Sequence, residues 1–246
     1  MPRFFVSDEQ FNAGLNQVTL VGDDARHIAR SLRMAVGDFV TVCSLTGQAF
    51  SCKLLSIHDE EVVAEVVSPI LKDGEMPVEV KLFFGYPKGD KLETIVQKAV
   101  ELGAHTITPF DSEFCVKRPD ADKVRARLPR WNKIATEAAK QCGRSYIPAV
   151  TEPLSYAEML DAAGECQLVL FCYEADGAHS LKTVLTHMGG VASVAVIVGA
   201  EGGFSPKEAA AAAARGYHLV NLGPRILRCE TAPLYALAAL SYFYEL

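Results

Sequence analysis

The chain has 246 residues, half of them hydrophobic, and a formal net charge of −6. This length favours two unequal domains. No apolar run reaches the roughly 18 residues that a membrane span needs, and no apolar segment precedes Asp8, so we expect a cytoplasmic protein without a signal sequence. The seven cysteines form no CxxC pair and no tight Cys/His cluster, which argues against a disulfide framework and against a bound metal.

The negative net charge argues against a generic nucleic-acid coat protein, but the charged residues are unevenly distributed along the chain. Between Lys117 and Lys133 there are seven Lys/Arg and two Asp, a local balance of 7 − 2 = +5. Such a stretch permits RNA binding, although a solvated surface is the commoner explanation.

The residues up to about Ile70 predict a strand-rich unit, a small barrel or closed sheet. Alternating and β-branched apolar residues mark strands at Val18–Gly22, Asp38–Cys43, Ala49–Ile57 and Glu61–Val67.

One helix is predicted in this region, over Asp23–Arg33. It would place Arg26, Arg30 and Arg33 on one face, since they are spaced by four and three residues. The stripe could bind phosphates, or it could be a solvated face paired with nearby acids.

The segment Ser68–Pro77 is rich in Pro, Gly and charge, and it predicts a domain boundary, which we place between residues 72 and 73. Beyond it, strands and helices alternate. Short apolar runs of this kind are typical of a parallel sheet covered on both faces. The predicted strands are Val78–Gly85, His105–Phe110, Gln167–Tyr173, Val194–Gly199 and Tyr217–Leu222.

Helices are predicted at Lys91–Leu102 and Trp131–Cys142, and a third begins at Ser205, which starts a capping box, and ends at Gly216. The last segment, Pro233–Leu246, is apolar nearly all round. It must therefore be buried in the core or against another subunit, and we expect a homodimer.

Two strand ends could carry chemistry. The strand that ends at Val198 runs into Gly-Ala-Glu-Gly-Gly and then into a capped helix, which indicates a ligand at the sheet edge, although a plain tight turn is the alternative. The second segment, Leu222–Ala232, places Arg225, Arg228 and Glu230 between a buried strand and an apolar helix. A salt-bridged turn is the alternative there.

Other polar residues have weaker patterns. Glu137 and Gln141 share a helix face, Arg144 follows that helix, and Lys88 lies between a strand and a helix, but each also fits a solvated position. The histidines are dispersed, and no Ser/His/Asp or Cys/His arrangement supports hydrolase chemistry.

Taken together, several segments resemble the ribosomal RNA small-subunit methyltransferase E family, which belongs to the SPOUT class. The most specific is LGPRILRCETA (Leu222–Ala232), and VGAEGGFSPKE (Val198–Glu208) adds moderate support. The remaining matches are PRFF (Pro2–Phe5), HIARSLRMAVGD (His27–Asp38), KGDKLETIVQKAVELGA (Lys88–Ala104) and RWNKIATEAAKQCGRSYIP (Arg130–Pro148).

The resemblance implies N3-methylation of one uridine in 16S ribosomal RNA, with S-adenosylmethionine as the methyl donor. It implies a PUA-like β-barrel over residues 1–72 that helps to hold the RNA. Residues 73–246 would form an α/β SPOUT domain whose parallel sheet contains a trefoil knot. The partners would be ribosomal RNA or the small ribosomal subunit and a second copy of the chain.

In such proteins the cofactor is contacted mainly by the backbone of three strand-end loops, here Cys172–Glu174, Gly199–Gly203 and Leu222–Leu227. We therefore expect the following cofactor residues: Tyr173, Glu174, Gly199, Glu201, Gly202, Leu222, Gly223, Arg225, Ile226 and Leu227. Glu230 is the candidate proton acceptor, and Arg228 would stabilise charge on the uracil oxygens. The expected RNA contacts are Arg3, Arg30, Arg33, Lys88, Gln141 and Arg144.

One residue departs from the family pattern. Ala200 stands where proline is usual, which predicts a looser cofactor loop with unchanged chemistry. Two other classes would share some of these features: a nucleotide-binding metabolic α/β enzyme would use the same glycine loop, and a non-catalytic RNA-binding adaptor would need only the arginines of the first domain.

Overall fold

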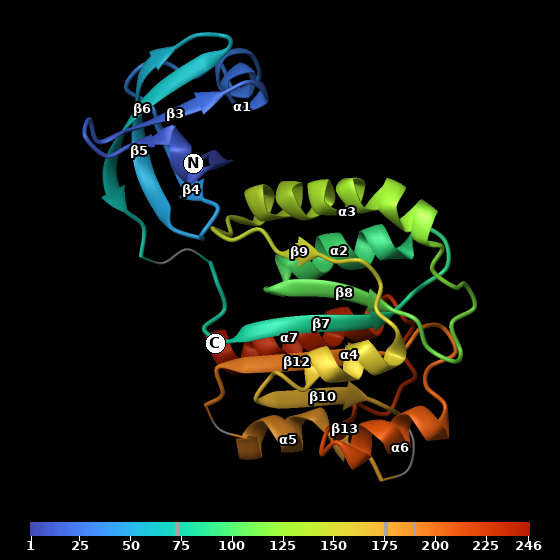
Figure 1. Cartoon of the computed structure of the whole chain (residues 1–246). Coiled ribbons are helices and arrows are strands. Elements are labelled where there is room, and N and C mark those ends of the chain that lie inside the picture. The colour runs from blue at the N-terminus through green and yellow to red at the C-terminus, as the bar shows by residue number, and fades with distance from the viewer. Residues whose placement is uncertain (72–73, 175–176, 189) are drawn as a thin grey trace. The chain divides into compact units, whose positions relative to one another are not determined.

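The structure is a computed structural model that describes residues 1–71, 74–174, 177–188 and 190–246 (Figure 1). It divides into two compact units. The amino-terminal unit comprises Met1–Glu75 and Ala139–Ile147, and the sheet unit comprises Met76–Ala138 and Pro148–Leu246. No helix among the described residues is long and apolar enough to cross a membrane.

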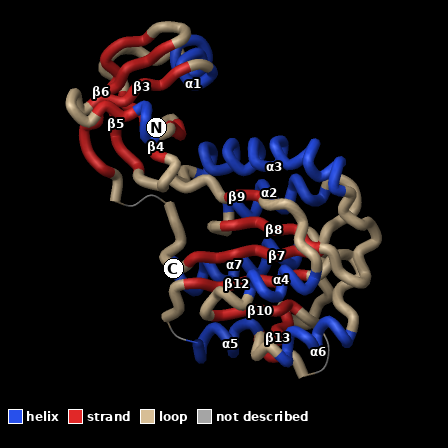
Figure 2. Tube along the Cα trace, viewed as in Figure 1, coloured by secondary structure: helices blue, strands red, loops and turns tan. Residues whose placement is uncertain are grey.

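The amino-terminal unit contains a curled six-stranded sheet with the order β1-β4-β5-β6-β3-β2 (Figure 2). The four predicted strands are present, and two short strands near the amino terminus join them. Because the pairing order runs from β1 to β2 without closing in the described part of the chain, the sheet is a half-barrel. Its strands are β1 (Arg3–Val6), β2 (Phe11–Asn12), β3 (Gln17–Val21), β4 (Phe39–Ser44), β5 (Ala49–Ile57) and β6 (Glu61–Pro69), and a short turn of helix, η1 (Asp8–Gln10), precedes β2.

The prediction of a helix over Asp23–Arg33 is wrong for the second half of this segment. The α-helix α1 (Asp23–Arg26) continues as a π-helical turn, η2 (His27–Ser31), and Arg33 has a φ of 50°. A π-turn and a left-handed residue both break the spacing that would align three arginines. Two of the arginines are instead paired with acids: Arg26 with Asp23 and Glu60, and Arg30 with Asp59.

The sheet unit confirms the predicted parallel α/β architecture. Its strand order is β11-β13-β10-β12-β7-β8-β9, and all the pairings are parallel. All five predicted strands are present, whereas the two edge strands have only two residues each, too few for a hydropathy pattern. The strands are β7 (Glu79–Gly85), β8 (Thr106–Phe110), β9 (Ala149–Val150), β10 (Leu168–Cys172), β11 (His179–Ser180), β12 (Ser193–Val198) and β13 (His218–Asn221).

Helices cover both faces of this sheet (Figure 1). On one face, α4 (Tyr156–Ala163) and α6 (Pro206–Ala214) pack on strand side chains such as Phe83 and Phe171. The predicted capping box starts α6, where the Ser205 hydroxyl accepts from the Glu208 backbone N–H. The helices α2 (Lys91–Glu101) and α7 (Thr231–Glu245) contact each other, and α7 contacts β12. The short α5 (Leu181–Met188) packs near β13.

The helix α3 (Ala121–Cys142) begins ten residues earlier than the predicted Trp131. The prediction stopped short because Pro129 lies inside the helix, where proline normally breaks the hydrogen-bond pattern. As a result, most of the basic stretch between Lys117 and Lys133 is helical rather than part of a loop.

The expected division at residues 72 and 73 falls outside the described residues. The compact units also differ from two contiguous segments, because Ala139–Ile147 belongs to the amino-terminal unit. There, the Glu75 carboxylate accepts from the Arg144 guanidinium and from the backbone N–H of Ser145 and Tyr146.

Glu75→Ala should lower the free energy of unfolding by about 3 kcal/mol, because it leaves the guanidinium of Arg144, only 3% exposed, without its carboxylate. The matched control is Glu60→Ala, which removes an exposed partner of Arg26 and should cost much less, because exposed ion pairs contribute little to stability. Urea denaturation of both variants measures the difference. Equal losses would contradict a structural role for the Arg144 pair.

Candidate functional site

The strands β10, β12 and β13 lie side by side and parallel, so the segments that follow them meet at one edge of the sheet. These segments surround a cavity of about 460 Å³. All ten residues expected to bind a cofactor line it: Tyr173, Glu174, Gly199, Glu201, Gly202, Leu222, Gly223, Arg225, Ile226 and Leu227. The expected catalytic residue Arg228 also lines it.

The loop after β12 needs glycine for two different reasons. A Cβ on Gly199 would lie 2.9 Å from the backbone of Gly203, so only glycine lets the two segments approach this closely. Gly203 itself has a φ of 66°, a conformation that side chains disfavour. The Gly203 N–H donates to the Ala200 carbonyl, which closes a tight turn. The backbone of this turn therefore forms one wall of the cavity.

The segment after β13 turns at Gly223, whose φ is 103°, and leads into α7. Ile226 is 85% exposed at the cavity mouth. The Arg228 carbonyl accepts from the backbone N–H groups of Thr231 and Ala232, which fixes the start of the helix. The positive end of the α7 dipole therefore lies beside the cavity and favours negative charge there.

Lys91, the first residue of α2, holds two of these segments together. Its Nζ lies 3.0 Å from Glu201 Oε1 and 3.2 Å from Glu230 Oε2, and it contacts the Cys229 sulfur at 3.5 Å. Sequence reasoning selected Lys88 instead, whose side chain is exposed and whose backbone N–H donates to Glu201. No pattern in the sequence distinguishes Lys91, because its two carboxylate partners approach it only in the folded chain.

The two carboxylates around Lys91 remain ionised. Burial raises the pKa of Glu201, but hydrogen bonds from its own backbone N–H and from Lys91 outweigh burial and lower it. Burial likewise raises the pKa of Glu230, and hydrogen bonds from the Cys229 thiol, its own backbone N–H and Lys91 lower it overall. The hydrogen bond to Glu201 is the main reason that the pKa of Lys91 is raised.

Two thiols at the cavity are poor nucleophiles. Burial raises the pKa of Cys172 to about 12, and burial together with the hydrogen bond to Glu230 raises that of Cys229 to about 12. Both thiols are therefore neutral near pH 7 and line the cavity as small apolar groups. One carboxylate oxygen, Glu201 Oε2, is buried without a hydrogen-bond partner among the described residues.

Most of the expected RNA contacts lie in the amino-terminal unit. There, Arg3 donates to the Cys43 sulfur, Arg30 pairs with Asp59, and Arg33 and Gln141 have exposed side chains. The expectation for Arg144 is corrected, because this side chain is buried and its guanidinium binds Glu75. Among the described residues, no group of three or more His, Cys, Asp or Glu is placed to hold a metal ion.

Lys91→Met should raise the pKa of both Glu201 and Glu230, because it removes a hydrogen bond that favours each ionised carboxylate. Carboxyl-carbon NMR titration would measure the shift. The control is Lys88→Met, which keeps the backbone N–H that reaches Glu201 and should leave both pKa values unchanged. Unshifted carboxylates in Lys91→Met would show that Lys91 does not determine their charge.

Family models and known proteins match this chain over most of its length. A family model described as RNA methyltransferase domain matches residues 74–241, and one described as RNA methyltransferase PUA domain matches residues 20–67. The ribosomal RNA small subunit methyltransferase E of Bacillus subtilis is 35% identical over 93% of this chain and 91% of its own length. The protein of the same name from Synechocystis is 33% identical over 93% of this chain and 74% of its own length.

Two solved structures resemble the whole chain. One is a ribosomal RNA small subunit methyltransferase E from Neisseria gonorrhoeae bound to S-adenosylmethionine, with a TM-score of 0.83 and 31% identity over 99% of this chain and 98% of that one. The other is a methyltransferase from Legionella pneumophila in complex with the same cofactor, with a TM-score of 0.81 and 28% identity over 98% of this chain and 96% of that one. The resemblance seen in the sequence is thus confirmed, and the chain belongs to the ribosomal RNA small subunit methyltransferase E family.

Proposed function

We propose that the protein transfers a methyl group from S-adenosylmethionine to N3 of one uridine in 16S ribosomal RNA. The observation that carries this proposal is the cavity at the carboxyl edge of the sheet. It gathers the residues of three loops that are far apart in the sequence, and a pair of ionised carboxylates held by Lys91 lies at its border.

The residues of the cavity suit S-adenosylmethionine. Its volume of about 460 Å³ lies within the usual range for small-molecule sites, and Leu222, Ile226 and Leu227 supply apolar contact. The buried Glu201 Oε2 offers an acceptor for a polar hydrogen of the ligand. The turn between Gly199 and Gly203 brings backbone groups against it. When bound, the cofactor supplies an electrophilic methyl group on a positively charged sulfur.

The uridine must lose its N3 proton as it gains the methyl group, so an acceptor is needed near the cavity. We assign this role to Glu230, which is ionised and hydrogen-bonded by Lys91 and the Cys229 thiol. Because its pKa is lowered, Glu230 is a weak base, and proton transfer becomes favourable only as the N3–carbon bond forms. Arg228 lines the cavity and can stabilise negative charge on the uracil oxygens.

The target uridine must be unpaired or flipped out, since N3 lies on the Watson–Crick edge. Lys88 of the sheet unit and Arg3, Arg30, Arg33 and Gln141 of the amino-terminal unit are proposed RNA contacts. Arg30 would have to exchange Asp59 for a phosphate, which is feasible because both side chains are more than half exposed.

The remaining proposals concern organisation. We propose functional domains at 1–72 and 73–246, a trefoil knot in the second, and a cytoplasmic homodimer. The exposed aromatic side chains of Tyr235, Tyr242 and Phe243 on α7 support the dimer, because they extend an apolar helix face outward.

The direct test is to incubate the protein and S-adenosylmethionine with small-subunit RNA from a strain that lacks this enzyme, and to map methyl groups by mass spectrometry. The expected product is 3-methyluridine at a single position. Methylation of another base, of a ribose, or of no nucleotide would contradict the proposed reaction, whereas displacement of the cofactor by a dinucleotide would favour a metabolic enzyme.

Glu230→Gln should lower the rate at saturating RNA by roughly 100- to 10,000-fold, because the amide cannot accept the proton. In the wild type, the activity that depends on ionised Glu230 is lost only as the pH falls below the ordinary Glu range near 4.3, since the pKa of Glu230 is lowered. Single-turnover rates across pH measure both effects, and calorimetry should show unchanged cofactor affinity. A wild-type rate in the Gln variant would exclude Glu230 as the acceptor.

A further inference from the structure

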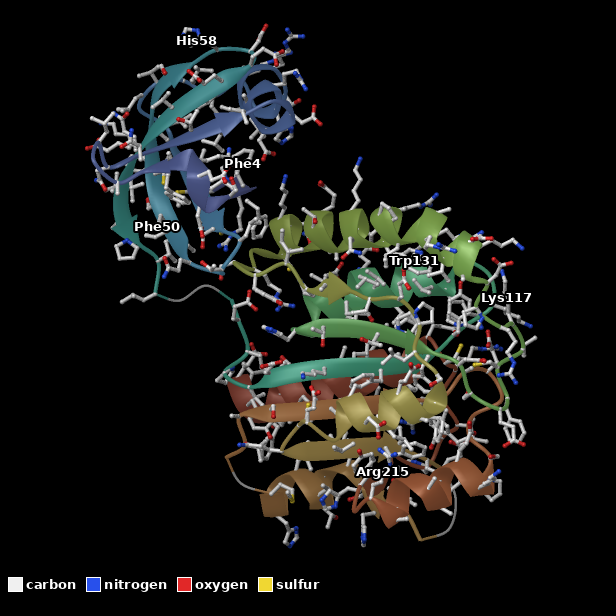
Figure 3. The ribbon with its side chains drawn as sticks, viewed as in Figure 1. Phe4, Phe50, His58, Lys117, Trp131 and Arg215 are labelled. Atoms are coloured by element: carbon white, nitrogen blue, oxygen red, sulfur yellow. The ribbon has the colours of Figure 1, made fainter. Side chains whose placement is uncertain are left out.

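A second, smaller hollow lies at the same edge of the sheet. Its lining comes from the segment after β7, from the first turn of α2, from the connection between β8 and α3, and from α3. The lining residues are Tyr86, Pro87, Gly89, Asp90, Leu92, Glu93, Lys117, Arg127 and Trp131. Figure 3 labels Lys117 and Trp131 at the end of the sheet unit toward which the β7 and β8 arrows of Figure 1 point. None of these residues belongs to the cofactor cavity.

The donors around this hollow lack partners within the protein. Tyr86 is 4% exposed and Trp131 is 2% exposed, yet neither the tyrosine hydroxyl nor the indole N–H has a hydrogen-bond partner among the described residues. Neither atom is among the fully buried polar atoms that lack a partner, so both polar atoms are accessible to solvent although their rings are buried. Burial raises the pKa of Tyr86, so its hydroxyl stays protonated and able to donate. The hollow therefore offers two neutral donors to an acceptor from outside the protein.

The charges around the hollow favour an anion. Lys117 and Arg127 form no ion pair among the described residues, whereas Lys123 and Arg125 of the same basic stretch are paired with Asp120 and Asp122. Two carboxylates, Asp90 and Glu93, also line the hollow, and Arg130 neutralises Glu93. Two free cations thus face one free carboxylate.

The size of the hollow decides which anion fits. Its volume of about 10 Å³ corresponds to a single water-sized oxygen, which excludes a nucleobase but admits one oxygen of a phosphate. S-adenosylmethionine carries no phosphate, whereas an RNA strand carries one at every nucleotide, so RNA is the substrate that can supply it.

The two sites are physically linked. The short segment between β7 and α2 lines the hollow with Tyr86, Gly89 and Asp90, and the next residue, Lys91, lines the cofactor cavity. Within the same segment, the Lys88 backbone N–H donates to Glu201 of that cavity. An RNA strand whose phosphate enters the hollow would therefore contact the segment that also borders the cofactor cavity.

We propose that Tyr86, Lys117, Arg127 and Trp131 bind a backbone phosphate of the substrate RNA next to the methylated nucleotide. This inference rests on the proposed function, because it takes RNA as the second substrate. It assigns a positioning role to residues outside the cofactor cavity.

The test compares Lys117→Ala/Arg127→Ala with Lys123→Ala/Arg125→Ala, which removes the same charge from the same stretch but only from cations that already have partners. The dissociation constant for a small-subunit ribosomal RNA fragment is measured over a range of salt concentrations. The first variant should bind roughly tenfold more weakly at low salt. Its log–log salt slope should flatten by about 0.7 for each cation removed. The control variant should stay close to wild type in both.

Four further readouts separate the possible outcomes. The first variant should keep wild-type cofactor affinity in calorimetry, and its KM for RNA should rise with little change in kcat. Tyr86→Phe should weaken RNA binding without changing the salt slope, because it removes a donor but no charge. Inorganic phosphate should compete with RNA for the wild type and not for the first variant.

The proposal is overturned if both double variants bind RNA equally well, or if inorganic phosphate binds the hollow while RNA affinity is independent of Lys117 and Arg127. The RNA-binding assay does not need turnover. A protein that binds RNA through these residues but methylates no uridine would contradict the proposed reaction and leave the phosphate site standing.

Discussion

The ion pairs of Lys91 with Glu201 and Glu230 are the interaction on which the site depends. One cation at the start of α2 joins the turn after β12 to the segment that enters α7, and these segments are 29 positions apart in the chain (230 − 201). Without the cation, two partly buried carboxylates would lie near each other uncompensated. The same cation helps to keep Glu230 ionised, together with hydrogen bonds from the Cys229 thiol and the Glu230 backbone N–H, so the geometry of the cavity and the charge of the proposed proton acceptor are linked.

Much of the site could be predicted from the sequence because parallel sheets place their strand ends at one edge. The glycine turn after Val198 and the segment Leu222–Leu227 were both recognised as strand-end loops, and the structure gathers them around one cavity. Lys91 was missed because a lysine at a helix start has no distinctive pattern in the sequence. Its role depends on two carboxylates that approach it only in the folded chain.

The prediction failed where local geometry departs from regular helices. The π-turn at His27–Ser31 and the left-handed Arg33 disrupt an arginine stripe that ideal spacing predicts. The first half of α3 is not predicted because it contains Pro129, and proline normally marks a helix end. The ion-pair partners of Arg30 and Arg144 could not be predicted either. These partners, Asp59 and Glu75, are 29 and 69 residues away in the sequence.

The most direct test of this account is a crystal structure of the protein with S-adenosylmethionine. We expect the cofactor in the cavity of about 460 Å³, against the Gly199–Gly203 turn and the Leu222–Leu227 segment, with Lys91 still between Glu201 and Glu230. Cofactor bound elsewhere, or bound in the cavity with Lys91 released from both carboxylates, would contradict it.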